Sequence, residues 1–87
     1  MIAYQVTIAD SAKKELKSLP SDVTQRVWDK IRELPENPRP PGCKKLHGYK
    51  SRWRIRIGHY RVVYDIDDAQ RTVDITRVAH RREVYEP

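Results

Sequence analysis

The sequence predicts an α+β domain in which an N-terminal strand and a helical hairpin pack on a largely antiparallel four-stranded sheet. Three observations predict this class. A chain of 87 residues is long enough for one hydrophobic core, so a single domain over residues 1–87 is expected. Apolar residues recur at helical spacing in the first half and at alternate positions in the second half. A proline-rich loop separates the two patterns, and this order is typical of helices layered on an antiparallel sheet.

The elements of the first half follow from periodicity and from residues that start or stop helices. Residues 2–8 alternate in polarity and predict a half-buried strand. A short helix is expected next, capped by Asp10 or Ser11 and ending at Pro20. Apolar residues at helical spacing then predict a second amphipathic helix over residues 22–34. The two helices therefore form a hairpin joined by a tight turn.

The second half begins with a loop and continues as strands. Residues 35–45 contain four prolines and a glycine, which extend neither a helix nor a central strand. Strands are expected at about 53–57, 60–66 and 72–80, with a polar turn between the last two. The second half therefore supplies most of the sheet.

The cysteine content and the absence of targeting segments predict a cytoplasmic protein. Cys43 is the only cysteine, so no internal disulfide can form, and no Cys/His set has the spacing of a zinc site. No stretch approaches the ~18 apolar residues that would span a bilayer, and the N-terminus lacks a signal-peptide pattern. We therefore expect a reducing cytoplasm, no membrane partner, no metal and no cofactor.

The positive charge is concentrated in one segment. The net charge is +6. Residues 1–43 carry seven Lys and Arg against six Asp and Glu, and residues 65–87 carry four against six, whereas residues 44–64 carry seven against none. Such a concentration is expected of a protein that meets a polyanion such as nucleic acid. The alternative interpretation is a solvated basic face that only aids solubility.

The charged segment contains a predicted hairpin with one apolar face and one arginine face. A two-residue turn at 58–59 would set Arg56 directly opposite Arg61 on the exposed face, with Arg54 two residues along. Like charges opposite one another weaken a sheet by up to about 1 kcal/mol. A phosphate bound between the guanidinium groups would relieve this repulsion. We therefore expect a phosphate site at this hairpin.

A second group of ionisable residues lies near the C-terminus. His80, Arg81, Arg82 and Tyr85 fall within the short segment HRREVY. In isolation such residues are more often packed or solvated side chains than catalysts. If the last strand pairs beside residues 60–66, however, the segment would come near the arginines of the hairpin.

These features together resemble the RelE/ParE family of toxins from toxin–antitoxin pairs, and its RelE branch in particular. The resemblance is carried by the helical hairpin with its Leu-Pro turn, by KKLHGYKSRWRIRIGHYRVVYDI at 44–66 and by RVAHRREVY at 77–85. It implies a compact α+β ribonuclease with a short C-terminal helical turn. It also implies ribosome-dependent cleavage of mRNA in the ribosomal A site, and inhibition by a cognate antitoxin. Contact with operator DNA is expected only through that antitoxin.

The resemblance also assigns roles to individual residues. The family's basic strand residues fall on Arg54, Arg56 and Arg61, and its terminal Arg and Tyr fall on Arg81 and Tyr85. Well-known members carry lysines where this chain has Arg54 and Arg56, which puts proton transfer by these positions in doubt. The spacing between the terminal Arg and Tyr is shorter here, so Arg82 is an alternative counterpart to Arg81.

The chemistry expected of this site is metal-independent attack of the RNA 2′-hydroxyl on the adjacent phosphate. Arginines stay charged at any working pH, which suits stabilisation of the phosphorane but not removal of a proton. Histidine has an ordinary pKa of about 6.5, so His80 is one candidate for proton transfer. Tyr85 is the other candidate, although it could instead stack on a base. The expected catalytic residues are Arg54, Arg56, Arg61, His80, Arg81 and Tyr85.

Further RNA contacts are expected from other residues of the two segments, because phosphate contacts are independent of RNA sequence. These residues are Lys44, Lys45, Lys50, Arg52, His59 and Arg82. Two other classes of function remain open: a ParE-like non-enzymatic gyrase inhibitor and a non-catalytic RNA-binding module. The inhibitor has no need to assemble the arginine cluster, and the binding module would be expected to expose an aromatic platform that the sequence lacks.

Overall fold

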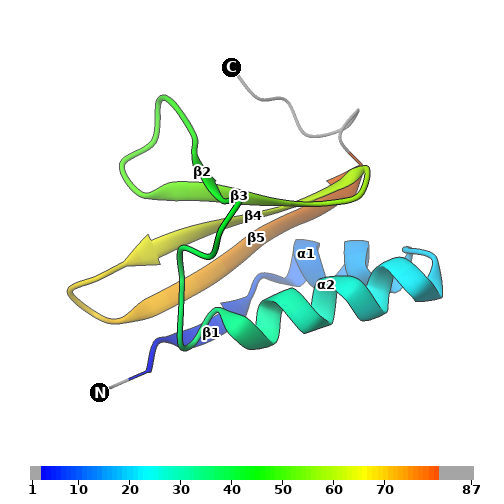
Figure 1. Cartoon of the computed structure of the whole chain (residues 1–87), viewed down its shortest axis with the longest axis horizontal. Helices are drawn as coiled ribbons and strands as arrows, with labels where there is room; N and C mark the ends of the chain where they lie inside the picture. Colours follow the sequence, from blue (N-terminus) through cyan, green and yellow to red (C-terminus); the bar gives the residue numbers. More distant parts are fainter. Residues whose placement is uncertain (1–2, 81–87) are drawn as a thin grey trace.

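The computed structural model describes residues 3–80 and has the α+β architecture expected from the sequence. In chain order its elements are β1 (Gln5–Ile8), α1 (Asp10–Lys17), α2 (Ser21–Glu33), β2 (Lys44–Lys45), β3 (Arg52–Ile57), β4 (Tyr60–Asp67) and β5 (Thr72–His80). The two helices lie side by side against one face of the sheet (Figure 1). The C-terminal helical turn implied by the resemblance falls outside the described residues.

The sheet has five strands in the order β1-β5-β4-β3-β2. β1 runs parallel to β5, while the β5–β4, β4–β3 and β3–β2 pairs are antiparallel. Four of these strands are the expected ones. The fifth, β2, has two residues and pairs with β3, with Lys44 opposite Arg54. Two lysines directly after a proline-rich loop form no alternating pattern, so this strand could not be predicted from the sequence.

The first helix begins directly after the first strand. The prediction that Asp10 or Ser11 caps it is wrong, because the N-cap position falls on Ala9, which makes no side-chain capping bond. The Ala9 N–H donates to the Ile75 carbonyl at 2.8 Å, and its own carbonyl accepts from the Lys13 N–H at 2.9 Å. The sheet therefore fixes the start of α1. Neither of the helices in residues 3–80 has the length and apolar character needed to cross a bilayer.

The hydrophobic core lies between the helices and the inner face of the sheet. Each helix buries one stripe of residues, as the periodicity predicts. The central strands send alternate residues to the core, except that a register shift between Val63 and Tyr64 changes the spacing along β5. The buried core residues are Ala12, Leu16, Val23, Val27, Ile31, Leu34, Ile55, Ile57, Val62, Tyr64, Ile66, Val73, Ile75 and Val78. Because the helices occupy this face, the opposite face of the sheet is the one that side chains from β2, β3 and β4 can present to a ligand.

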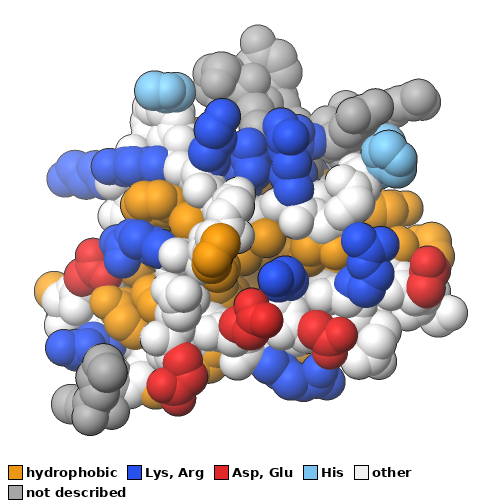
Figure 2. All heavy atoms as spheres, viewed as in Figure 1, with side chains coloured by type: hydrophobic (Ala, Val, Ile, Leu, Met, Phe, Trp, Pro, Cys, Tyr) orange, Lys and Arg blue, Asp and Glu red, His pale blue; other side chains and the backbone are white. Residues whose placement is uncertain are grey.

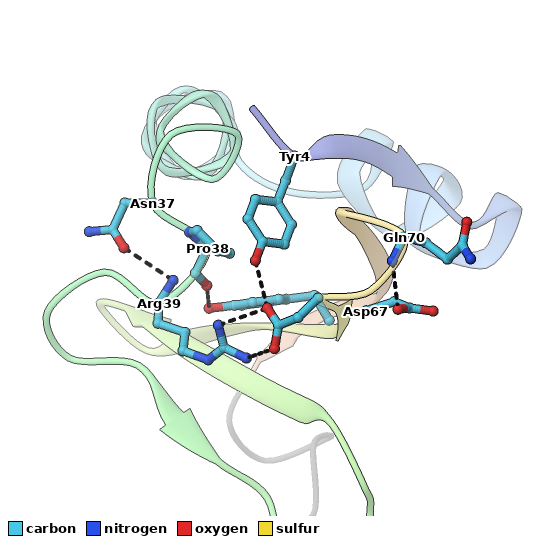
Figure 3. Close-up of polar contacts among 8 residues, drawn as sticks. Tyr4, Asn37, Pro38, Arg39, Asp67 and Gln70 are labelled. Atoms are coloured by element: carbon cyan, nitrogen blue, oxygen red, sulfur yellow. Dashed lines mark hydrogen bonds and ion pairs between the residues drawn. The ribbon is translucent and has the colours of Figure 1, made fainter. Parts of the chain in front are cut away.

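The proline-rich loop is anchored to the sheet by polar side chains. Arg39 makes two hydrogen bonds to Asp68, from Nη1 to Oδ1 at 3.2 Å and from Nη2 to Oδ2 at 2.8 Å (Figure 3). Tyr4 donates its hydroxyl to Oδ1 of Asp68 at 2.6 Å, and Tyr64 donates its hydroxyl to the Pro38 carbonyl at 2.9 Å. These contacts hold the loop in place before it enters β2.

Candidate nucleic-acid interface

The β3–β4 hairpin has the register expected from the sequence. Arg56 lies opposite Arg61, and the apolar partners of the inner face also pair as predicted. Gly58 and His59 form the two-residue turn, and Gly58 has a φ of 60°. Glycine adopts this left-handed conformation without the steric cost that a side chain brings, and two-residue hairpin turns require it. The turn chemistry therefore sets two arginines side by side.

The three arginines of the hairpin differ in exposure. Arg56 is exposed and Arg61 is half-buried, but only 3% of Arg54 is exposed. The prediction that Arg54 lies on an exposed face is therefore wrong. Arg54 sits between β2 and β4 in the sheet, and its Nη1 donates to the Gly42 carbonyl at 3.4 Å. A small apolar cluster on the same face contributes further burial, formed by Leu46, Val63 and Ala79.

The burial of Arg54 strengthens its attraction for an anion. A guanidinium group keeps its charge at any ordinary pH. Charges interact more strongly where the surroundings are less polar than water. Arg54 shares its strand with Arg56, and the neighbouring strand carries Arg61. The hairpin therefore combines one buried cation with two that are at least partly exposed.

Among residues 3–80, some basic side chains form ion pairs with acidic residues and others do not. Ion pairs join Lys13, Lys30, Arg32, Arg39, Arg52 and Arg77 to carboxylates. Within residues 3–80, no ion pair joins a carboxylate to Arg26, Lys44, Lys45, Lys50 or Arg56. Figure 2 shows Lys and Arg side chains gathered along the upper edge, over β2 and β3, with Asp and Glu confined to the lower half.

Arg52 belongs to the first group although the sequence indicated an RNA contact. Its Nε and Nη2 donate to the two carboxylate oxygens of Asp65 at 2.8 and 3.1 Å. The hydrogen bond to Asp65 raises the pKa of Arg52 above its usual value. Its guanidinium also lies 4.4 Å from the centre of the Tyr49 ring. Arg52 therefore has a structural partner that offsets its charge.

β5 brings the backbone of His80 beside the hairpin but turns its side chain toward the helices. His80 pairs with Tyr60, and Ala79 pairs with Arg61. Because side chains alternate along a strand, Ala79 shares the face of Arg61 while His80 shares the face of Tyr60. The His80 ring lies 5.3 Å from the Tyr60 ring and 6.0 Å from the His59 ring. The imidazole therefore lies on the face of the sheet opposite to Arg61, and proton transfer by His80 stays a prediction.

The remaining predicted residues fall into two sets. Lys44 and Lys45 are exposed on β2, and Lys50 is exposed in the segment that leads into β3. Lys44 and Lys45 therefore lie on the strand that pairs with β3, and Lys50 lies shortly before β3 in the chain. Arg81, Arg82 and Tyr85 lie outside the described residues.

One basic residue near the hairpin was missed by sequence reasoning. Arg26, an exposed residue of α2, extends its guanidinium over the β3–β4 turn. Its Nη1 and Nη2 lie 3.5 Å from the position that a Cβ atom on Gly58 would take. An exposed arginine on an amphipathic helix carries no distinctive signal, and only the packing of α2 against β3 brings it to the turn.

Comparisons with known proteins agree in both sequence and structure. A family described as "ParE toxin of type II toxin-antitoxin system, parDE" matches residues 6–85. Toxin RelE3 of Methanocaldococcus jannaschii is 30% identical over 86 residues, which covers 94% of this chain and 96% of that protein. A toxin structure in the archaeal RelE-RelB complex from Pyrococcus horikoshii OT3 has a TM-score of 0.83 and 27% identity, covering 95% of this chain and 100% of that one. A chain of the toxin-antitoxin complex RelBE2 from Mycobacterium tuberculosis has a TM-score of 0.78 and 31% identity, covering 91% of this chain and 99% of that one.

Proposed function

The chain belongs to the RelE/ParE family of toxins from toxin–antitoxin systems, and from this premise we propose that it is a ribosome-dependent endoribonuclease that cleaves mRNA. The observation that carries the proposal is the pairing of Arg56 with Arg61 beside the buried Arg54. A like-charged pair destabilises a sheet. Its presence in a segment without acidic residues is accounted for by an anionic ligand.

The ligand that suits this cluster is a phosphodiester group of RNA. Planar guanidinium groups donate parallel hydrogen bonds to phosphate oxygens, so Arg56 and Arg61 can contact one phosphate, and the buried Arg54 adds its charge from the same strand as Arg56. Arg54 and Arg61 are partly or wholly buried, so their donors are held in place before the substrate arrives. Donors fixed in this way stabilise the charge that develops in a transition state.

The reaction is attack by the RNA's own 2′-hydroxyl on the neighbouring phosphorus. A bond forms between the 2′-oxygen and phosphorus while the bond to the 5′-oxygen of the next nucleotide breaks. The leaving 5′-oxygen takes a proton from solvent water, so the products are a 2′,3′-cyclic phosphate and a 5′-hydroxyl. The arginines stabilise the doubly charged phosphorane, and Arg81 joins them by resemblance. Tyr85 takes the proton of the 2′-hydroxyl or stacks on a base, also by resemblance, because arginine cannot serve as the base.

Contacts with the ribosome come from the unpaired lysines. Lys44, Lys45 and Lys50 are exposed, and no ion pair within residues 3–80 joins them to an acidic residue. Such residues hold nucleic acid by its phosphates without reading its sequence. The ribosome then presents the codon to the toxin. Association should weaken steeply as the salt concentration rises, because each phosphate contact releases counterions.

A cognate antitoxin is the protein partner. The similar solved structures include toxins in complex with antitoxins named RelB. An acidic segment of the antitoxin would cover the basic residues of β2 and β3 and so exclude RNA. Operator DNA would be contacted only through the antitoxin.

A reconstituted translation reaction tests this function. We expect the purified toxin to cleave a message only while ribosomes translate it, leaving a cyclic phosphate at the new 3′ end. A message with 2′-deoxyribose at the cleaved nucleotide removes the nucleophile and should resist cleavage. Cleavage of both messages would contradict the mechanism. Inhibition of gyrase supercoiling without cleavage would instead support the ParE-like alternative, and RNA binding without product would support a non-catalytic module.

A further inference from the structure

A cavity of about 280 Å³ lies on the helix side of the sheet, at the end of β5. Its lining includes Glu15, Ser18 and Leu19 from the end of α1 and Tyr60 and His80 from the two paired strands. Figure 1 shows the end of β5 beside the β3–β4 hairpin and close to the helices. The cavity is therefore next to the arginine cluster along the strands, but it opens on the other face of the sheet.

The polar part of the cavity is a carboxylate held in a fixed position. Oε1 of Glu15 accepts the backbone N–H of Val78 at 2.9 Å, and Oε2 accepts Nε of Arg77 at 3.3 Å. Each carboxylate oxygen has two acceptor positions, so each keeps one for a ligand. The ion pair with Arg77 also offsets the negative charge, which reduces the repulsion that an RNA strand would meet.

The apolar part of the cavity is aromatic. The Tyr60 and His80 rings meet edge to face at 79°, and His59 lies 6.0 Å from His80. Aromatic and imidazole rings are the side chains on which unpaired RNA bases stack. A cavity with ring faces and a fixed hydrogen-bond acceptor has the two features needed to hold a nucleobase by its face and its edge.

We propose that this cavity binds one nucleobase of the mRNA near the cleaved phosphate and favours bases that carry an exocyclic amino group. The identity of the polymer rests on the proposed function. The preference follows from Glu15, because a carboxylate accepts hydrogen bonds from the amino groups of adenine or cytosine, whereas uracil has no amino group. The base occupies the space between Glu15 and the Tyr60 ring.

The path of the RNA follows from the ladder between β4 and β5. Arg61 and Ala79 form the residue pair next to Tyr60 and His80, so the phosphate site and the cavity are neighbours across the end of the sheet. Arg26 lies over the turn at Gly58 and can contact a phosphate as the strand passes around the hairpin. A strand that passes around the hairpin can therefore place a phosphate at the arginines and the base of a nearby nucleotide in the cavity.

Nuclear magnetic resonance of the isotope-labelled full chain tests base binding without ribosomes or cleavage. The probes are adenosine 5′-monophosphate, uridine 5′-monophosphate and ribose 5-phosphate, which lacks a base. We expect adenosine monophosphate to shift the amide signals of Ser18, Tyr60 and Val78, and to bind about tenfold more tightly than ribose 5-phosphate, since stacking on an aromatic ring contributes about this factor. Uridine monophosphate should bind more weakly than adenosine monophosphate. Equal shifts from adenosine monophosphate and ribose 5-phosphate would overturn the proposal.

A matched pair of variants locates the effect. Ser18 is exposed at the rim, so Ser18→Trp should fill the cavity without disturbing the core, whereas Lys17→Trp places the same bulk outside it. Ser18→Trp should abolish the adenosine-specific shifts and change which codons are cut in the translation assay, and Lys17→Trp should do neither. Retention of the adenosine-specific shifts in Ser18→Trp would contradict the cavity as the binding site. Loss of cleavage in the wild type would refute only the proposed function, because the binding experiment contains no ribosome.

Discussion

The arginines at the two ends of β3 and β4 lie opposite different kinds of residue. At the hairpin end, Arg56 lies opposite another arginine, and in the described part of the chain no carboxylate pairs with it. At the other end, Arg52 lies opposite Asp65 and makes a bidentate ion pair with it. Arg39 in the adjoining loop does the same with Asp68. The same side-chain type therefore serves the fold where it is paired, and it is available to a ligand where it is not.

The difference in pairing predicts a difference in what each arginine contributes. An exposed ion pair adds little net stability, because water already solvates both charges and the pair must be held in one geometry. A cation that faces another cation adds none, and it costs stability until an anion arrives. Substitutions at the hairpin end should therefore affect activity strongly, and substitutions at the paired end should affect stability by a small amount and leave activity nearly unchanged.

The largest expected effect is on cleavage by variants of the hairpin arginines. Arg56→Ala and Arg61→Ala should each lower kcat/KM for ribosome-dependent cleavage by about 100-fold, since each removes one donor that stabilises the phosphorane. Arg32→Ala is the matched control, because Arg32 lies on α2 and pairs with Asp29 at 2.9 Å. Measured rates that fall equally in the control would show that the loss is not specific to the hairpin.

The second largest expected effect is the stabilisation of the folded protein by inorganic phosphate. At ten times its dissociation constant, an anion that binds only the folded state raises the free energy of unfolding by about 1.4 kcal/mol. Urea unfolding with and without phosphate should show this gain in the wild type and a smaller gain in Arg56→Ala. Arg32→Ala should keep the full gain, and an equal response in all three proteins would mean that phosphate acts elsewhere.

Sequence reasoning predicted local features more completely than features that depend on distant segments. The register of β3 and β4 was predictable because Gly58 fixes a two-residue turn and alternation fixes the faces. The burial of Arg54 was not predictable, since it depends on β2 and on an apolar cluster drawn from three separate parts of the chain. Arg26 was missed for the same reason. The face of the sheet on which His80 lies follows from its pairing with Tyr60, but the sequence does not specify the register of β5 that sets this pairing.

Tyr64→Phe tests the paired end through stability. The Tyr64 hydroxyl donates to the Pro38 carbonyl at 2.9 Å, and burial raises the pKa of Tyr64 so that the hydroxyl stays protonated. Loss of this hydrogen bond should lower the free energy of unfolding by about 1 kcal/mol. Cleavage should change less than twofold, since the hydroxyl lies on the core side of the sheet. A loss of cleavage comparable to that of Arg56→Ala would contradict the division between the two ends.

The smallest expected effect is the pH dependence of the ion pair between Arg39 and Asp68. The hydrogen bond from Arg39 lowers the pKa of Asp68 below the ordinary value of 3.8, and the hydrogen bond from Tyr4 adds to this. A carboxylate with a lowered pKa contributes stability above its unfolded pKa and loses it as the pH falls through the folded pKa. The wild type should therefore be more stable than Asp68→Asn at pH 6, and this advantage should shrink below about pH 3.8.

The difference between the wild type and Arg56→Ala should not change in this way, because within residues 3–80 no carboxylate pairs with Arg56. Equal pH dependence of the two differences would remove the distinction between Arg39, which pairs with Asp68, and Arg56.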